Sequence, residues 1–116
     1  MSERFLLLTA HPWEHDTIFT ICQDPEIVWW INLYDSAAKG SIVTYSADGS
    51  FVSPFESGNW KFSNGENEIV TFDTDDPSDI LGHVRIDVLI DDVLEVTDLA
   101  EVPPSDTCYI KGRFIK

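Results

Sequence analysis

The sequence predicts a mostly β protein whose strands form an antiparallel up-and-down barrel. Turn signals recur between apolar segments, at Ala47-Asp48-Gly49, Asn64-Gly65 and Asp91-Asp92, and Asp-Gly and Asn-Gly are strong hairpin signals. Apolar and polar residues alternate along the segments between these turns, as they do over residues 84–90, which is typical of strands. Strands joined in succession by tight turns are antiparallel neighbours, and closing them into a barrel removes exposed edges.

A short helix and a long strand are predicted first. Residues 3–10 carry a one-sided apolar patch and predict one or two helical turns. The segment from Trp13 to Cys22 contains β-branched and aromatic residues and predicts a strand.

A second helix is predicted over Pro25–Lys39. Asp24 is a good N-cap, Pro25 suits the first turn, and Gly40 would end the helix. The residues that follow a 3.6-residue period are Ile27, Trp30, Ile31, Tyr34 and Ala38. A strand remains the alternative, because Ile-Val-Trp-Trp-Ile is also strong strand material.

The rest of the chain predicts hairpins. The expected strands span residues 41–46, 50–53, 60–63, 68–73, 84–90, 93–99 and 107–115. A cone-shaped α+β fold, with helices packed into a curved sheet, has the same order of a helix followed by hairpins and is the alternative architecture.

Composition and charge limit the classes of function. The 116 residues are 43% hydrophobic and 12% aromatic, enough for one core, and we expect a single domain over residues 1–116. A net charge of −14 argues against binding to nucleic acid or to an anionic membrane, which requires Lys and Arg. Neither a signal peptide nor an apolar run of about 18 residues is seen, so a cytoplasmic location is expected.

Two hairpin segments resemble those of bacterial lipocalin-like domains. Asp48-Gly49-Ser50-Phe51 followed by Gly58-Asn59-Trp60-Lys61-Phe62 is similar to the D-G-[ST]-[FY] … G-x-W-x-[LF] pattern of that group, and Leu8–Trp13 resembles its opening. The resemblance covers about residues 5–115 and implies a calycin-type barrel. It also implies a closing pair in which Arg113 of the last strand packs on Trp13 of the first, a cation–π contact contributing roughly 0.5–2 kcal/mol.

The resemblance and the supply of aromatic residues together favour a non-enzymatic protein that holds a small apolar or amphipathic ligand inside the barrel. The candidate lining residues are Trp30, Tyr34, Tyr45, Phe51, Trp60 and Phe62. A filled interior is the alternative, because a barrel of about eight strands is just wide enough for its own side chains.

No metal site is predicted. His11 and His15 share a strand face with Trp13, but at about 3.3 Å per residue they lie about 13 Å apart, too far for one ion with bonds of about 2 Å. We interpret both histidines as surface residues near a strand end. The acidic loop over residues 73–79 lacks the Gly and Glu of a calcium-binding EF-hand loop.

No catalytic residue and no cofactor are predicted. The sequence contains no Gly-x-Ser-x-Gly, no phosphate-binding glycine loop and no His-Glu-x-x-His. Cys22 and Cys108 are far apart and outside any metal-binding spacing. They are expected to be reduced and buried, with a disulfide as the alternative.

The acidic surface suggests a second class of function. Thirteen acidic residues and one basic residue, Arg85, lie between Phe62 and Ile110. Such a surface keeps a protein soluble, and it also attracts basic partners. An acidic module that binds a basic protein, as an inhibitor or immunity-type partner, is therefore the alternative function.

Overall fold

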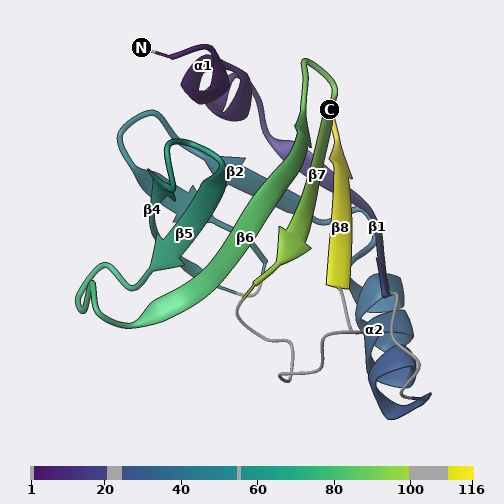
Figure 1. Ribbon diagram of the computed structural model, residues 1–116. Helices are drawn as coiled ribbons and strands as arrows, with labels where there is room; N and C mark the ends of the chain where they lie inside the picture. The colour runs from purple at the N-terminus through teal and green to yellow at the C-terminus, as the bar shows by residue number, and fades with distance from the viewer. Residues whose placement is uncertain (1, 21–24, 55, 100–109) are drawn as a thin grey trace.

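Eight antiparallel strands form a closed barrel in this computed structural model, which describes residues 2–20, 25–54, 56–99 and 110–116. Each strand pairs with its neighbours in the sequence, and the last strand pairs with the first (Figure 1). The strands are β1 (Trp13–Thr20), β2 (Ile42–Tyr45), β3 (Ser50–Val52), β4 (Ser57–Ser63), β5 (Glu68–Phe72), β6 (Ile80–Leu89), β7 (Val93–Asp98) and β8 (Ile110–Ile115). The predicted fold class is confirmed.

The turns that predicted the hairpins have the backbone geometry that their residues favour. In the β2–β3 turn, Asp48 accepts a hydrogen bond from the Ser50 N–H at 2.9 Å, and Gly49 has a φ of +91°. In the β4–β5 turn, Asn64 and Gly65 have φ of +51° and +63°, a region that Asn and Gly enter most readily. Local turn chemistry therefore sets the order of the strands.

Helix α1 (Glu3–Thr9) covers one end of the barrel (Figure 1). The Ser2 side chain caps it by accepting from the Phe5 N–H at 3.1 Å, and the same hydroxyl donates to Glu66 in the β4–β5 turn at 2.6 Å. Arg4 donates to the Glu66 backbone carbonyl at 3.1 Å. These contacts place Leu8 over the core, where it is fully buried.

Helix α2 (Pro25–Ala38) lies beside β1 near the other end of the barrel (Figure 1). It confirms the helix predicted from the 3.6-residue period. The side of the helix that is removed from solvent carries Ile31, Asp35 and Ala38, and Trp30 lies outside it at 58% exposure.

The hydrophobic core lies inside the barrel, between these two helices. Its buried residues come from α1 and from all eight strands, and they include Leu8, Trp13, Tyr45, Phe51, Trp60, Ile69, Ile86, Leu94 and Val96, together with Ile110. Cys22 and Cys108 lie outside the described residues. In the part of the chain that the structure describes, neither helix is long and apolar enough to cross a membrane.

Candidate functional site

A cavity of about 200 Å³ lies inside the barrel and opens beside α2. Its walls are mainly apolar, and the lining residues include Val43 of β2, Phe51 of β3, Ile69 of β5, Val84 of β6 and Phe114 of β8. The polar groups that also face it include His15, Tyr34, Tyr45, Glu56 and Thr71. An apolar wall with few polar groups is the usual composition of a site for a small organic molecule.

A β-bulge in β1 brings two residues of that strand to the cavity. His15 lies opposite Phe114 of β8, and Ile18 lies opposite Gly112, with the register shifting between His15 and Thr17. The extra residue of the bulge changes the alternation of the strand. As a result, His15 and Ile18 both line the cavity although they are three positions apart.

Asp35 of α2 fixes the imidazole of His15 and the free edge of β1. One carboxylate oxygen, Oδ1, accepts from the Ile18 backbone N–H at 2.7 Å and lies 3.2 Å from His15 Nε2. Beyond Glu14, β1 has no register partner in β2, so the side chain of Asp35 takes the place of a strand carbonyl. The helix is thereby held against the barrel, and its Ala38 forms part of the cavity wall.

The hydrogen bonds to Asp35 favour its ionised form. Burial opposes the charge, but the Ile18 N–H and the His15 ring outweigh burial, and they hold the pKa of this carboxyl below its ordinary value. A carboxylate is an acceptor only, so His15 Nε2 carries the hydrogen of this bond. The imidazole is further packed by the edges of Tyr34 and Phe114, at 6.3 Å and 5.6 Å between ring centroids.

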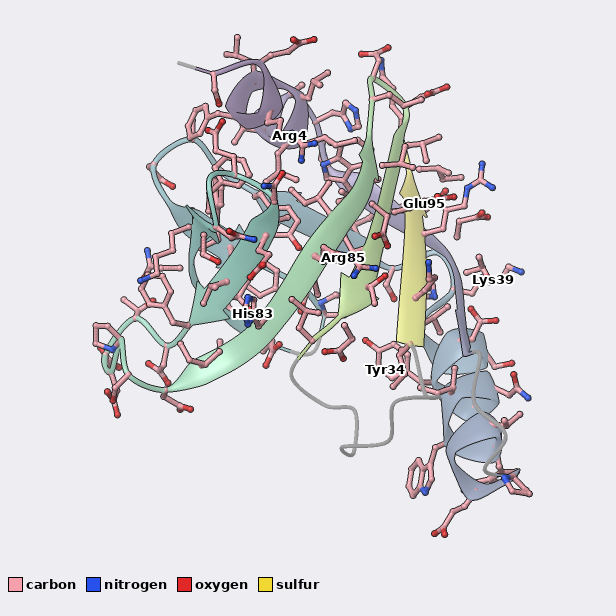
Figure 2. All side chains as sticks on the ribbon, viewed as in Figure 1. Arg4, Tyr34, Lys39, His83, Arg85 and Glu95 are labelled. Atoms are coloured by element: carbon pink, nitrogen blue, oxygen red, sulfur yellow. The ribbon has the colours of Figure 1, made fainter. Side chains whose placement is uncertain are left out.

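The cavity has a deep end near α1 and a mouth near α2. Tyr45 forms the deep end: its ring lies 5.9 Å from that of Trp60, which in turn lies 5.7 Å from Phe5 of α1. Burial raises the pKa of Tyr45, so its hydroxyl stays neutral. At the mouth, burial raises the pKa of the Tyr34 phenol, and the nearby Glu56 and Asp98 raise it further. Figure 2 shows Tyr34 projecting from α2 near the end of β8.

Three of the six predicted lining residues face the cavity, and three lie elsewhere. Tyr34, Tyr45 and Phe51 line it. Trp60 belongs to the packed end under α1: it is 6% exposed, its indole N–H donates to the Ser46 carbonyl at 2.8 Å, and Phe62 packs on it at 5.1 Å.

Trp30 lies on the solvent side of α2 and packs on Trp29 at 5.2 Å. The sequence placed it on the buried face because it belongs to the apolar periodicity of the helix. The helix instead turns the polar Asp35 toward β1, about 140° around the axis from Trp30 at 100° per residue.

The structure does not bring Trp13 and Arg113 together. Trp13 faces inward, is fully buried, and donates its indole N–H to the Leu8 carbonyl at 3.0 Å. Arg113 lies between the inward-facing Gly112 and Phe114, so it points outward, 3.7 Å from Asp16 and 3.9 Å from Glu95. The expected cation–π pair is therefore replaced by surface ion pairs.

The two histidines interpreted as surface residues have different positions. His11 is bound through its ring nitrogens to the Pro12 and Asp91 carbonyls, at 2.7 and 2.8 Å. His15 is only 4% exposed, so its interpretation as a surface residue is wrong. No group of three or more His, Cys, Asp or Glu side chains converges on a metal position among the described residues.

Sequence reasoning missed His15 and Asp35 as site residues. A signal for His15 was present, because a residue that shares a strand face with the buried Trp13 must also face inward. Asp35 gave no comparable signal, since a carboxylate on a helix is most often a solvent-exposed residue.

Comparison with known proteins adds no family: no family model, no curated protein and no solved structure matches this chain.

Proposed function

We propose that this protein binds a small apolar or amphipathic molecule inside the barrel, without catalysing a reaction. The observation that supports the proposal is the cavity of about 200 Å³ lined by Val43, Phe51, Ile69, Val84 and Phe114. A core of this size would ordinarily be filled by side chains. An apolar volume that the side chains do not occupy has the composition of a binding site.

The volume limits the ligand to a small molecule. An apolar cavity of about 150 Å³ holds benzene, so this one suits a single substituted ring or a short branched chain. A long acyl chain would have to extend through the mouth, past Tyr34 and Glu56. We therefore propose a ligand of about ten heavy atoms.

The proposal includes membership of the lipocalin-like group. It is supported by the closed antiparallel barrel, by the short helix that leads into β1, and by the hairpin motifs at Asp48–Phe51 and Gly58–Phe62. The proposed role requires neither a metal nor a cofactor.

A titration with propylbenzene tests the proposal. Methyl groups of Val43, Ile69 and Val84 line the cavity, so their NMR resonances should shift together and saturate at one equivalent. Shifts that never saturate, or that spread over the outer surface, would contradict the proposal.

A matched pair of variants locates the binding. Val84→Phe places a larger side chain in the cavity and should weaken binding at least about tenfold. Val52→Phe is the control, because Val52 is 53% exposed on the outside of β3, and it should leave the affinity unchanged.

A basic protein partner is the second candidate. It is supported by the net charge of −14. It is also supported by three exposed acidic residues of the β5–β6 loop, Asp75, Asp76 and Asp79. The described cations of β6 and β8, Arg85, Lys111 and Arg113, each lie within 4.0 Å of a carboxylate. If propylbenzene and its polar analogues all fail to bind, this candidate takes precedence.

A further inference from the structure

One side of the His15 imidazole is held by the protein, and the other side is not. Nε2 donates to the Asp35 carboxylate at 3.2 Å, so in the neutral ring Nδ1 carries a lone pair and accepts hydrogen bonds. Within the part of the chain that the structure describes, no group donates to Nδ1. His15 is therefore a preformed acceptor without a donor.

This acceptor opens onto the cavity. His15 is 96% removed from solvent, and it lines the cavity wall. Among the described residues, every fully enclosed side-chain nitrogen or oxygen has a hydrogen-bond partner. Because Nδ1 of His15 has no partner, we infer that it is not fully enclosed. The space that it reaches is the cavity that His15 lines.

The Tyr45 hydroxyl, at the deep end of the cavity, also lacks a hydrogen-bond partner among the described residues. Tyr45 is 9% exposed and lines the cavity. Its hydroxyl is therefore not fully enclosed either, and we infer that it also reaches the cavity. Because burial raises its pKa, this group is a neutral phenol that donates or accepts.

The charged side chains that line or flank the cavity are mainly acidic. No Lys or Arg is among its described lining residues. The Asp35 carboxylate lies behind His15, and Glu56 and Asp98 lie close enough to Tyr34 at the mouth to raise its pKa. Lys39 lies close enough to Asp35 to lower its pKa, but it does not line the cavity. An anion entering this space would meet carboxylates and no lining Lys or Arg.

We propose that the cavity selects a hydrogen-bond donor, a hydroxyl or amine on a small apolar body, and rejects carboxylates. The donor group bonds to Nδ1 of His15, and the apolar body lies against Phe51, Ile69 and Val84. A neutral hydroxyl satisfies the buried acceptor, whereas a carboxylate has no proton to give and is repelled by Asp35 and Glu56. This inference rests on the proposed function, since it names the ligand class of the same cavity.

Three molecules of nearly one shape test the proposal at pH 8: 4-propylphenol, propylbenzene and 4-propylbenzoate. At this pH the phenol is neutral and the benzoate is ionised. One additional hydrogen bond should make 4-propylphenol bind about three- to tenfold more tightly than propylbenzene. The benzoate should bind at least about tenfold more weakly than the phenol.

The outcomes separate the two proposals. If propylbenzene binds as tightly as the phenol, or the benzoate binds most tightly, the cavity is a binding site but donor selection is wrong. If none of the three binds, the proposed function itself is wrong.

His15→Phe and His83→Phe form a matched pair of variants. Phe at position 15 keeps an aromatic ring and removes the nitrogen that accepts in the cavity, so the advantage of the phenol over propylbenzene should disappear. His83 is also bonded to a carboxylate, Glu68, but it does not line the cavity, and its replacement should leave the advantage intact. An unchanged advantage in His15→Phe would overturn the proposal.

The unmodified protein provides a readout that does not depend on a variant folding. The ¹⁵N resonance of His15 Nδ1 should report an unprotonated nitrogen. It should move upfield with 4-propylphenol and remain in place with propylbenzene. A protonated Nδ1 in the free protein, or the same shift with both compounds, would overturn the proposal.

Discussion

At the end of the barrel under α1, Leu8 and Trp13 are fully buried and Trp60 is 6% exposed, whereas at the end beside α2, Tyr34 is 44% exposed and a cavity remains. The same strands run through both ends of the barrel. The difference lies in the helices. Helix α1 places Phe5 and Leu8 over the barrel interior, while α2 lies against the edge of β1 and contributes Ala38 to the wall of an open space.

This contrast shows how one barrel accommodates a packed end and an open end. The end under α1 is packed with aromatic and aliphatic side chains and stabilises the fold, because burial of such side chains contributes most per residue. The end beside α2 is held mainly by hydrogen bonds that involve Asp35 and His15. Polar contacts of this kind keep the strand edge in place without filling the cavity.

Trp13→Ala should have the largest effect on stability. The side chain is fully buried and its indole N–H bonds to Leu8, so the free energy of unfolding should fall by about 3–5 kcal/mol. Trp29→Ala is the control: Trp29 is 59% exposed, and its loss should cost under about 1 kcal/mol. Urea unfolding of both variants measures the difference, and equal midpoints would contradict the packed end described above.

Asp35→Ala should have the next largest effect. It leaves the Ile18 N–H and His15 Nε2 without their acceptor, which should lower the free energy of unfolding by about 2–3 kcal/mol. Asn32→Ala, at an exposed position of the same helix, should change it by under about 0.5 kcal/mol. A similar small change in both variants would show that α2 is not held to β1 by this carboxylate.

The acid dependence of stability should report the same contact. The pKa of Asp35 in the folded protein lies below its ordinary value of 3.8. Its stabilising contribution is therefore complete above that value and is lost as the pH falls through the lower, folded pKa. Asp35→Asn retains an acceptor without titrating, so its unfolding free energy should fall less steeply than that of the wild type as the pH falls below about 4. Parallel curves for the two proteins in urea melts would contradict the pKa shift.

Arg113→Ala should have the smallest effect. Arg113 is 44% exposed and pairs with Asp16 and Glu95 at 3.7 and 3.9 Å, and exposed ion pairs contribute about 0–1 kcal/mol. We expect a loss within that range in urea melts, reduced further by added salt. A loss well above 1 kcal/mol that is insensitive to salt would indicate a role in closing the barrel, as first expected from the resemblance.

The predicted elements that depend on neighbouring residues were confirmed. The Asp48-Gly49 and Asn64-Gly65 turns predicted hairpins, and Pro25 with the 3.6-residue period predicted α2. Of the six residues expected to line a cavity, Tyr34, Tyr45 and Phe51 do so, while Trp30, Trp60 and Phe62 do not. Aromatic composition identifies residues that avoid water, but it does not distinguish a packed layer from a cavity wall.

By itself, the sequence determined the strand order and the two helices, because turn geometry and side-chain periodicity depend on residues close in the chain. Only the tertiary structure decided which end of the barrel is filled and which is open. That outcome depends on where α1 and α2 dock, and on the bulge in β1 that turns both His15 and Ile18 inward. The pairing of His15 with Asp35 joins residues twenty positions apart. No local pattern encodes such a contact, because it forms only when the helix meets the strand edge that the barrel leaves open.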